Sequence, residues 1–183
     1  TLLVDTVSRN AAPVLSNANV LELASVDEDA AAPTAGTAGQ VIETWATSSV
    51  LSDADAADSL GIAITKISTQ GTLYYKLAGS SSWTEVVSAG AQEVSSTQAL
   101  LLQKNASLYF KPAENFNGDI STALEFRGWD GTAGTAGTAA SARQGDRADT
   151  TVNGGTSAFS VNSRTVKLAV ISVNDAPVLS VVP

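Results

Sequence analysis

The sequence contains no cysteine, no histidine and no methionine. Without cysteine the chain cannot form a disulfide framework, nor can it hold zinc or iron through thiolates. Without histidine it lacks the commonest general base, the commonest ligand of transition metals and the Ser-His pair of many hydrolases. These absences exclude large classes of enzymes and metalloproteins before any motif is considered.

Basic residues are also scarce, with 10 lysines and arginines against 18 aspartates and glutamates and a formal net charge of −8. Nucleic acids and anionic membranes attract basic surfaces, so neither is expected as a partner. A surplus of carboxylates is compatible with cation binding, although it also serves ordinary solubility. With 44% hydrophobic residues, the 183-residue chain can still build the core of a domain.

Long hydrophobic runs are missing as well. No apolar stretch approaches the roughly 18 residues that a membrane-spanning helix needs, so direct membrane insertion is not expected. Residues 1–10 include Asp5 and Arg9 and lack the apolar region of a signal peptide. Because the chain starts with Thr1 and not with methionine, we interpret it as a piece of a longer protein.

What the sequence does contain is an alternation of apolar and polar residues with period two, which is typical of β-strands. Clusters of Gly, Ser, Asn and Asp separate the alternating segments, and no amphipathic helix stands out. About eight such segments predict an all-β fold, a Greek-key β-sandwich. The expected strands are "VIETWA" (41–46), "GIAITKI" (61–67), "TLYYKL" (72–77), "WTEVV" (83–87), "SLYFKP" (107–112), "ALEFRGW" (123–129) and "TVKLAVISV" (165–173), with "TQALLLQ" (97–103) ambiguous between a strand and a helical turn.

Two copies of "TAGTAG", at 34–39 and 132–137, do not fit a strand. Gly, Thr and Ala bury little surface, so we expect both copies to be loops. The second copy belongs to a loop-like stretch at 130–150, which is long for a compact domain. A long Gly/Thr/Ala-rich loop of this kind is functional, disordered or tied down locally.

Nearly the same phrase occurs close to both ends of the chain, as "RNAAPVLS" at 9–16 and "VNDAPVLS" at 173–180. The two asparagines, Asn10 and Asn174, are 174 − 10 = 164 residues apart, about the size of one domain. The phrase therefore predicts the joint between copies of a repeated module. This divides the chain into the end of a preceding repeat with its linker (1–12), one domain (13–173) and a linker to the next repeat (174–183).

Acidic residues gather at turns and strand ends, and few lie inside strands. Calcium takes about six to eight oxygens from carboxylates, amides, backbone carbonyls and water, so acidic turns are candidate calcium sites. In a D-x-D loop, alternate side chains can converge on one ion. The five acidic segments are "VDEDA" (26–30), "SDADAAD" (52–58), "PAENFNGD" (112–119), "GWDG" (128–131) and "VNDAP" (173–177).

Each acidic segment also has a purely structural interpretation. A shared ion would explain all of the positions together, whereas the structural roles are separate. In the structural interpretation, a solvated surface is formed by Asp27, Glu28 and Asp29, and a turn is capped by Asp53, Asp55 and Asp58. Left-handed turn conformations are adopted by Asn115, Asn117 and Gly118, and a type I turn starts at Asp130.

Taken in order along the chain, these segments resemble the cadherin-like tandem repeats that serve as extender modules in very large secreted bacterial adhesins of the RTX type. The resemblance spans nearly the whole chain, and the pair "NFNG" (115–118) and "VNDAPVL" (173–179) is more specific than the D-x-D loop. It implies a cadherin-like or immunoglobulin-like sandwich that binds calcium around the joint between repeats. Carried over by position, the implied calcium ligands are Glu28, Asp53, Asp55, Glu114 with Asn117 or Asp119, Asp130, and Asn174 with Asp175.

The sequence departs from the family pattern at both joints. The opening joint has Ala11 where the closing joint has Asp175, so Asn10 is the remaining candidate ligand there. The closing joint has Ser172 where classical cadherins carry another aspartate, so a linker with a full set of ions is not expected. The prolines that follow each joint fix extended backbone geometry, which stiffens a short connection.

The function implied by the resemblance is that of a calcium-stabilised extracellular repeat of a bacterial surface adhesin. It would act as a rigid spacer in cell adhesion or biofilm formation, with neighbouring repeats of the same chain as partners. An alternative is a module that binds a glycan or protein through Trp129 and the 130–150 loop, or that associates with itself through a sheet edge. An enzyme could use paired carboxylates such as Asp53 and Asp130, as glycosidases do, but nothing in the sequence indicates a pocket and no enzymatic activity is expected.

Overall fold

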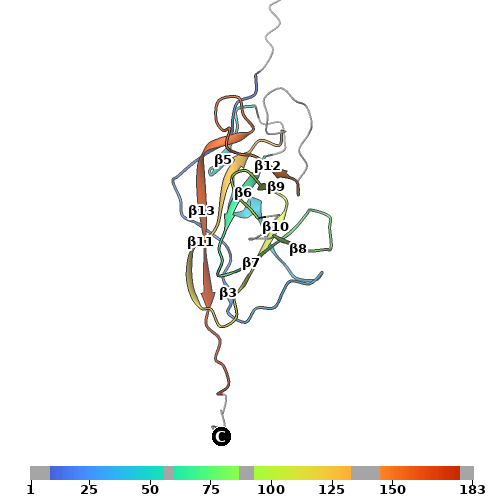
Figure 1. Cartoon of the computed structure of the whole chain (residues 1–183), viewed down its shortest axis with the longest axis vertical. Coiled ribbons are helices and arrows are strands. Elements are labelled where there is room, and N and C mark those ends of the chain that lie inside the picture. The colour runs from blue at the N-terminus through green and yellow to red at the C-terminus, as the bar shows by residue number, and fades with distance from the viewer. Residues whose placement is uncertain (1–8, 56–59, 87–92, 133–144, 178–183) are drawn as a thin grey trace, which may run out of the picture.

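The structure of the chain, a computed structural model, describes residues 9–55, 60–86, 93–132 and 145–177. These residues form an all-β sandwich, which confirms the fold class expected from the sequence. Residues 9–12 enter at one end of the elongated domain and residues 172–177 leave at the other (Figure 1). We call these the opening end and the closing end. No helix in the described ranges is long and apolar enough to cross a membrane.

The larger sheet is built on long central strands. β11 pairs antiparallel with both β6 and β13, whereas the short strands β2 and β3 run parallel to β13. The beginning and the end of the domain therefore lie side by side. Within the described residues the strand order is β12 (Arg147–Ala148), β9 (Ala99–Gln103), β6 (Gly61–Ile67), β11 (Gly118–Trp129), β13 (Phe159–Ile171) and β2 (Leu21–Glu22), with β3 (Val26–Asp27) also paired to β13.

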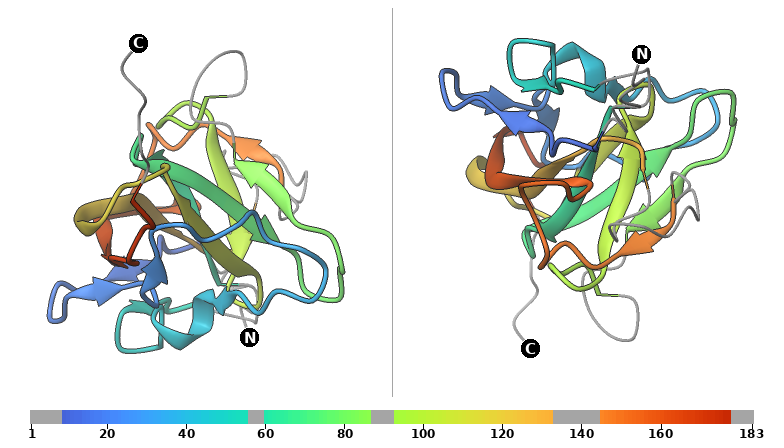
Figure 2. Two further views of the ribbon diagram at one scale, coloured as in Figure 1. Left: turned by 90° about the horizontal axis from the view of Figure 1, so that it is seen from below. Right: turned by 90° about the horizontal axis from the view of Figure 1, so that it is seen from above.

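The smaller sheet and a separate strand pair complete the sandwich. Views along the long axis show the blue and cyan segments, which include β1 and β5, at one side of the central strands (Figure 2). The smaller sheet has the order β4 (Gln40–Val41), β10 (Ser107–Pro112), β7 (Gly71–Lys76) and β8 (Thr84–Val86), and β1 (Val14–Leu15) pairs with β5 (Leu51–Ser52).

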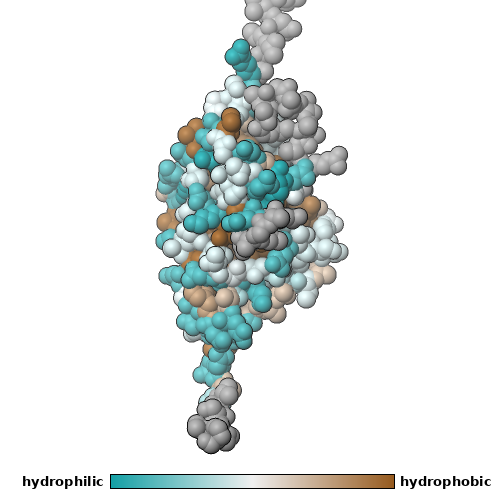
Figure 3. Space-filling model, in the orientation of Figure 1, coloured by the Kyte–Doolittle hydropathy of each residue, from teal (hydrophilic) through white to brown (hydrophobic). Residues whose placement is uncertain are grey.

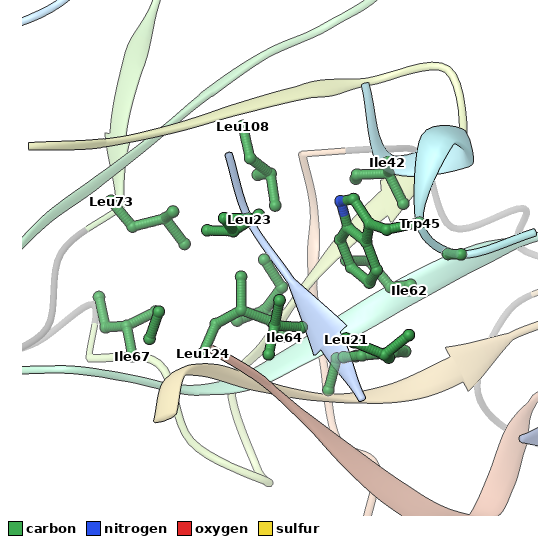
Figure 4. Packing of buried hydrophobic residues seen from close by; sticks show 14 of the residues in the cluster. Leu21, Leu23, Ile42, Trp45, Ile62, Ile64, Ile67, Leu73, Leu108 and Leu124 are labelled. Atoms are coloured by element: carbon green, nitrogen blue, oxygen red, sulfur yellow. The ribbon is translucent and has the colours of Figure 1, made fainter. Parts of the chain in front are cut away.

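The alternation read from the sequence corresponds to alternating burial in β10. Leu108 and Phe110 point into the core, while Tyr109 and Lys111 lie on the outer face. The main core lies between the sheets and includes Ile64 of β6 and Leu124 of β11 (Figure 4). Trp45 packs edge-on against Phe126 with 5.4 Å between ring centroids, a geometry worth about 0.5–1.5 kcal/mol beyond the buried area.

The expected strand at 41–46 is wrong beyond its first residue. β4 ends at Val41, and Ile42–Thr44 form a short 3-10 helix, η1. Ile42, Trp45 and Ala46 are all buried, and residues spaced three and four apart share one side in a helical turn but not in a strand. The ambiguous 97–103 segment, in contrast, contains the buried strand β9.

The remaining expected strands are confirmed with small changes in their bounds. β11 and β13 are longer than the alternating segments within them, and β8 is shorter. β6 is buried on both faces because a second apolar cluster covers the outer face of the larger sheet. That cluster contains Ala63, Ala99, Leu101, Trp129, Ala158 and Phe159.

The first "TAGTAG" segment is a loop, as expected, and it is held against the outer face of the smaller sheet. Lys76 donates to the carbonyl of Thr37 at 3.3 Å and lies 4.7 Å from the centre of the Trp83 ring. A Cβ on Gly39 would meet that ring at 2.2 Å, so this glycine lets the indole lie directly on the loop. The second copy at 132–137 lies almost entirely outside the described residues.

Candidate functional site

The acidic residues proposed as calcium ligands divide between the two ends of the domain. Asp130 lies beside the start of β13, since its backbone N–H donates to Ala158 at 3.1 Å. Glu28 lies beside the end of β13, since its N–H donates to Ile171 at 2.9 Å. β13 has 13 residues, so at about 3.3 Å per residue the two ends are roughly 40 Å apart. One ion therefore cannot bind both sets.

The opening group consists of Asn10, Asp53, Asp55 and Asp130, all at the end where the chain enters. The side-chain amide of Asn10 donates to Oδ2 of Asp130 at 2.8 Å. The backbone N–H of Ala11 donates to Oδ2 of Asp55 at 2.5 Å, and the N–H of Asp55 donates to Oδ1 of Asp53 at 2.8 Å. The linker residues and the D-x-D loop are thus joined directly.

Two of these aspartates accept hydrogen bonds within turns, and for Asp130 the bonds are made by the side chain and do not show the expected type I turn. The bond from the Asp55 N–H to Asp53 is an Asx turn within the D-x-D loop. Oδ1 of Asp130 accepts both the N–H and the hydroxyl of Thr132, at 2.8 and 2.6 Å. Asp58, the remaining member of that interpretation, lies outside the described residues.

Oδ2 of Asp53 is the unsatisfied atom of the opening group. It is buried and has no hydrogen-bond partner in the described structure. A buried carboxylate oxygen without a partner carries a desolvation cost that a bound cation would offset. The group contributes the carboxylates of Asp53, Asp55 and Asp130, and carboxylate oxygens are donors of the type that calcium prefers. The opening group therefore fits a calcium ion chemically.

The closing group consists of Glu28, Asp29, Glu114, Asn117 and Asp175. Glu28 is its centre, because only 4% of its surface is exposed. One of its carboxylate oxygens accepts the backbone N–H of Val173 at 2.5 Å, and the other accepts the side-chain amide of Asn117 at 2.8 Å. These bonds place a buried negative charge at the point where the last strand becomes the linker.

Asp29 is a closing-group residue that sequence reasoning did not select. Desolvation raises its pKa, and the nearby carboxylates of Asp175, Glu28 and Glu114 raise it further. Like charges gathered in this way favour either a proton or a cation among them. The sequence shows three adjacent acidic residues, "DED" at 27–29, but it does not indicate which of them lies near the other carboxylates of the closing group.

The Asn115–Gly118 turn shapes one side of the closing group. Asn115 has a φ of 56° and Gly118 a φ of 107°, as expected for residues that tolerate left-handed conformations. The same expectation for Asn117 is wrong, because its φ is not positive. Beside the turn is a hollow of about 210 Å³ whose lining includes Glu28, Asp29 and Glu114. Figure 3 shows hydrophilic surface gathered toward the closing end.

Two further candidate ligands lie at the closing end without contacting Glu28 in the structure. Asp119 is exposed near the start of β11, and its backbone pairs with Ala169. Asn174 is exposed in the linker, and its amide donates to the carbonyl of Asp175 at 3.3 Å. The structure thus brings Glu28, Glu114, Asn117 and Asp175 together and leaves Asp119 and Asn174 at the edge of the group.

Neither end holds a complete ligand cage by itself. Among the described residues, no cluster of three or more Asp or Glu side chains is arranged to bind a metal ion.

The tryptophan proposed for ligand binding is not available at the surface. Trp129 is fully buried beside Phe159 in the second apolar cluster, and its indole N–H donates to Thr132 at 2.7 Å. Strand β11 carries it into the sheet face, so the expectation that it contacts a glycan or protein is wrong. Most of the 130–150 loop lies outside the described residues.

Comparison of the chain with known protein families, with curated proteins and with solved structures finds no match.

Proposed function

We propose that this chain is a calcium-stabilised repeat module of a large bacterial surface adhesin. In this proposal the module is extracellular and acts as a rigid spacer in cell adhesion or biofilm formation. Its partners are the neighbouring repeats of the same chain. The finer Greek-key, cadherin-like assignment of the sandwich is part of the same proposal.

The observation that carries the proposal is the position of the two acidic groups. They lie at the two ends of β13, and the repeated phrase "NAAPVLS" or "NDAPVLS" marks the same two ends. In a tandem array the closing group of one module would face the opening group of the next. Each end would bind calcium weakly through its own partial ligand set, and the two sets together would complete the coordination shell.

Calcium would act in this arrangement as a link between modules. Glu28, Asp29, Glu114, Asn117 and Asp175 would hold it from one side, and residues equivalent to Asp53, Asp55 and Asp130 from the other. The ion would neutralise the repulsion that raises the pKa of Asp29 and would fix the linker between two domains. Calcium would thereby restrict the motion between neighbouring domains and make the array rigid.

Calcium titration calorimetry, combined with melting curves in calcium and in chelator, tests the proposal. Extracellular modules bind calcium with Kd values of about 10⁻⁴–10⁻³ M. In about 10 mM calcium, we expect the melting temperature to rise by roughly 3–10 °C for a domain of this size.

Matched variants locate the effect. Glu28→Gln keeps an acceptor for Val173 and can pair with a rotated Asn117 amide, but it removes the charge. We expect this variant to melt near the wild type in chelator and to lose most of the calcium response. Glu22→Gln makes the same change on an exposed position of β2 and should keep the response. If the wild type neither binds calcium nor shifts its melting temperature, the proposed function is wrong.

A further inference from the structure

The chain contains two Asn-Gly pairs, at 117–118 and at 153–154, and this pairing is prone to lose the amide of its asparagine. The backbone nitrogen of the glycine attacks the side-chain carbonyl carbon of the asparagine and closes a succinimide ring. The proton of that nitrogen goes to solvent, and the amide leaves as ammonia. Water then opens the ring at either carbonyl and gives aspartate or isoaspartate. Glycine has no Cβ to hinder the attack, so the surrounding structure decides whether each pair reacts.

The pair at 153–154 is held by bonds within its own loop. The side-chain amide of Asn153 donates to the carbonyls of Thr150 and Thr151 at 3.2 and 3.1 Å. The backbone N–H of Gly154, which is the attacking group, donates to the carbonyl of Phe159 at 2.8 Å. Both reacting groups are therefore engaged, and both residues are half-buried.

The pair at 117–118 lies at the surface and depends on a distant residue. Asn117 and Gly118 are both exposed. The side-chain amide of Asn117 donates to a carboxylate oxygen of Glu28 at 2.8 Å, across 89 residues of sequence. Gly118 is the first residue of β11, where it pairs with Val170. The bond to Glu28 thus restrains the side chain whose carbonyl carbon the Gly118 nitrogen would attack.

The same carboxylate also holds the closing linker. Its other oxygen accepts the backbone N–H of Val173, and only 4% of the surface of Glu28 is exposed. When the turn and the linker separate from Glu28, the Asn117 side chain becomes free to react. An aspartate formed at 117 would place a second carboxylate beside the buried one, and their repulsion would oppose the return of the native contact.

We propose that Asn117 is a deamidation site guarded by Glu28: the amide persists while the closing end is intact and is lost when the closing end opens. The reaction requires only water and residues of this chain, so it does not depend on calcium or on neighbouring repeats. Deamidation at Asn117 would turn a transient opening of the closing end into a permanent one.

Peptide mapping by mass spectrometry follows both pairs in one molecule, after incubation of the whole chain in mildly alkaline buffer with chelator. In the wild type we expect both asparagines to react more slowly than in urea, which removes the protection by the fold. In Glu28→Ala the reaction at Asn117 should be roughly 10-fold faster or more, because the lost bond to a charged group raises the open population by at least that factor. Asn153 in the same molecule should react within about twofold of its wild-type rate.

Glu28→Gln is the matched variant, because it keeps a hydrogen-bonding partner for the amide, and Asn117 should stay protected in it. Circular dichroism checks that both variants fold. Equal acceleration at Asn117 and Asn153 in Glu28→Ala would show that the whole domain opens, and it would overturn the guarding role of Glu28. The same role is overturned if Asn117 reacts no faster in Glu28→Ala than in the wild type.

Asn117→Asp supplies one product of the reaction directly. Its melting temperature in chelator should lie roughly 3–8 °C below that of the wild type, because the bond to Glu28 is replaced by repulsion. Asn162→Asp adds the same charge at an exposed position of β13 and should change the melting temperature by less than about 2 °C. If Asn117→Asp melts like the wild type, deamidation does not keep the closing end open.

Discussion

Oε1 of Glu28 accepts a hydrogen bond from the backbone N–H of Val173 at 2.5 Å, across 145 residues of sequence. The same carboxylate accepts the amide of Asn117 through its other oxygen. One buried side chain thus joins the first part of the domain, the turn before β11 and the exit of β13. It holds the closing linker in place and supplies the central charge of the closing group.

Replacing Glu28 should therefore reduce stability even without calcium. Glu28→Ala leaves the Val173 N–H and the Asn117 amide without their acceptor, and hydrogen bonds to a charged group contribute about 1.5–3 kcal/mol each. We expect a loss of about 2–4 kcal/mol in the free energy of unfolding, because the exposed linker and turn recover some bonding to water. Urea denaturation in chelator measures it. Glu22→Ala, on the exposed side of β2, should change stability by less than about 0.5 kcal/mol, and an equal effect of both variants would contradict the role of Glu28.

The loop at 34–39 offers a matched pair of glycines. A Cβ on Gly39 would lie 2.2 Å from the Trp83 ring and 2.8 Å from the carbonyl oxygen of Leu108, whereas a Cβ on Gly36 would meet nothing within 4 Å. Gly39→Ala should cost about 1–3 kcal/mol through overpacking. Gly36→Ala should be neutral or stabilise by up to about 1 kcal/mol, because it restricts the unfolded chain. Equal melting temperatures for the two variants would show that Trp83 does not rest on Gly39.

Asp29 should make the calcium-free protein more stable in mild acid. Its pKa is raised above the ordinary value of 3.8 by desolvation and by the carboxylates around it. The folded state therefore holds the proton more tightly than the unfolded state. The resulting stability is fully present below the ordinary value and is lost as the pH rises through the raised one.

Melting curves in chelator across this pH range, for the wild type and for Asp29→Asn, measure the contribution of Asp29. The melting temperature of the wild type, relative to that of the variant, should rise as the pH falls through the raised pKa of Asp29 and should fall as the pH increases. Asp119→Asn removes an exposed carboxylate from the same end but outside the closing group, so it serves as the control. A wild type and an Asp29→Asn variant with parallel pH profiles would mean that Asp29 is not affected by its neighbours.

The contribution of Asp149 to stability should depend on pH in the opposite way, because its pKa is lowered and not raised. The N–H and hydroxyl of Thr151 donate to its carboxylate at 2.8 and 2.6 Å and lower its pKa. The stability that these bonds provide is present above the ordinary value of 3.8 and is lost as the pH falls through the lowered one. Asp149→Asn keeps an acceptor for the turn and removes the titration, so its melting temperature should fall less steeply in acid. A steeper fall in the variant would contradict this assignment.

Much of the fold follows from local sequence pattern. Alternation with period two predicted β7, β10, β11 and β13, because one side of each strand must face the core. The prediction of a strand at 41–46 was wrong because Ile42, Trp45 and Ala46 are buried together through a helical turn. A short apolar run does not distinguish the period of a strand from that of a helix. The sequence pattern also did not predict the burial of Trp129, because this burial depends on Phe159 and Ala158 packing over the outer face of the larger sheet.

The sequence by itself determined the chemistry available to this protein: no thiolate, no imidazole, many carboxylates, and nearly the same phrase close to both ends. The tertiary structure decided which carboxylates meet. The length of β13 separates Asp130 from Glu28, and the parallel pairing of β3 with the end of β13 brings Glu28 and Asp29 to the linker that carries Asp175. These are contacts across more than a hundred residues, and no local pattern encodes them, because strand pairing and register arise from the packing of the whole sandwich.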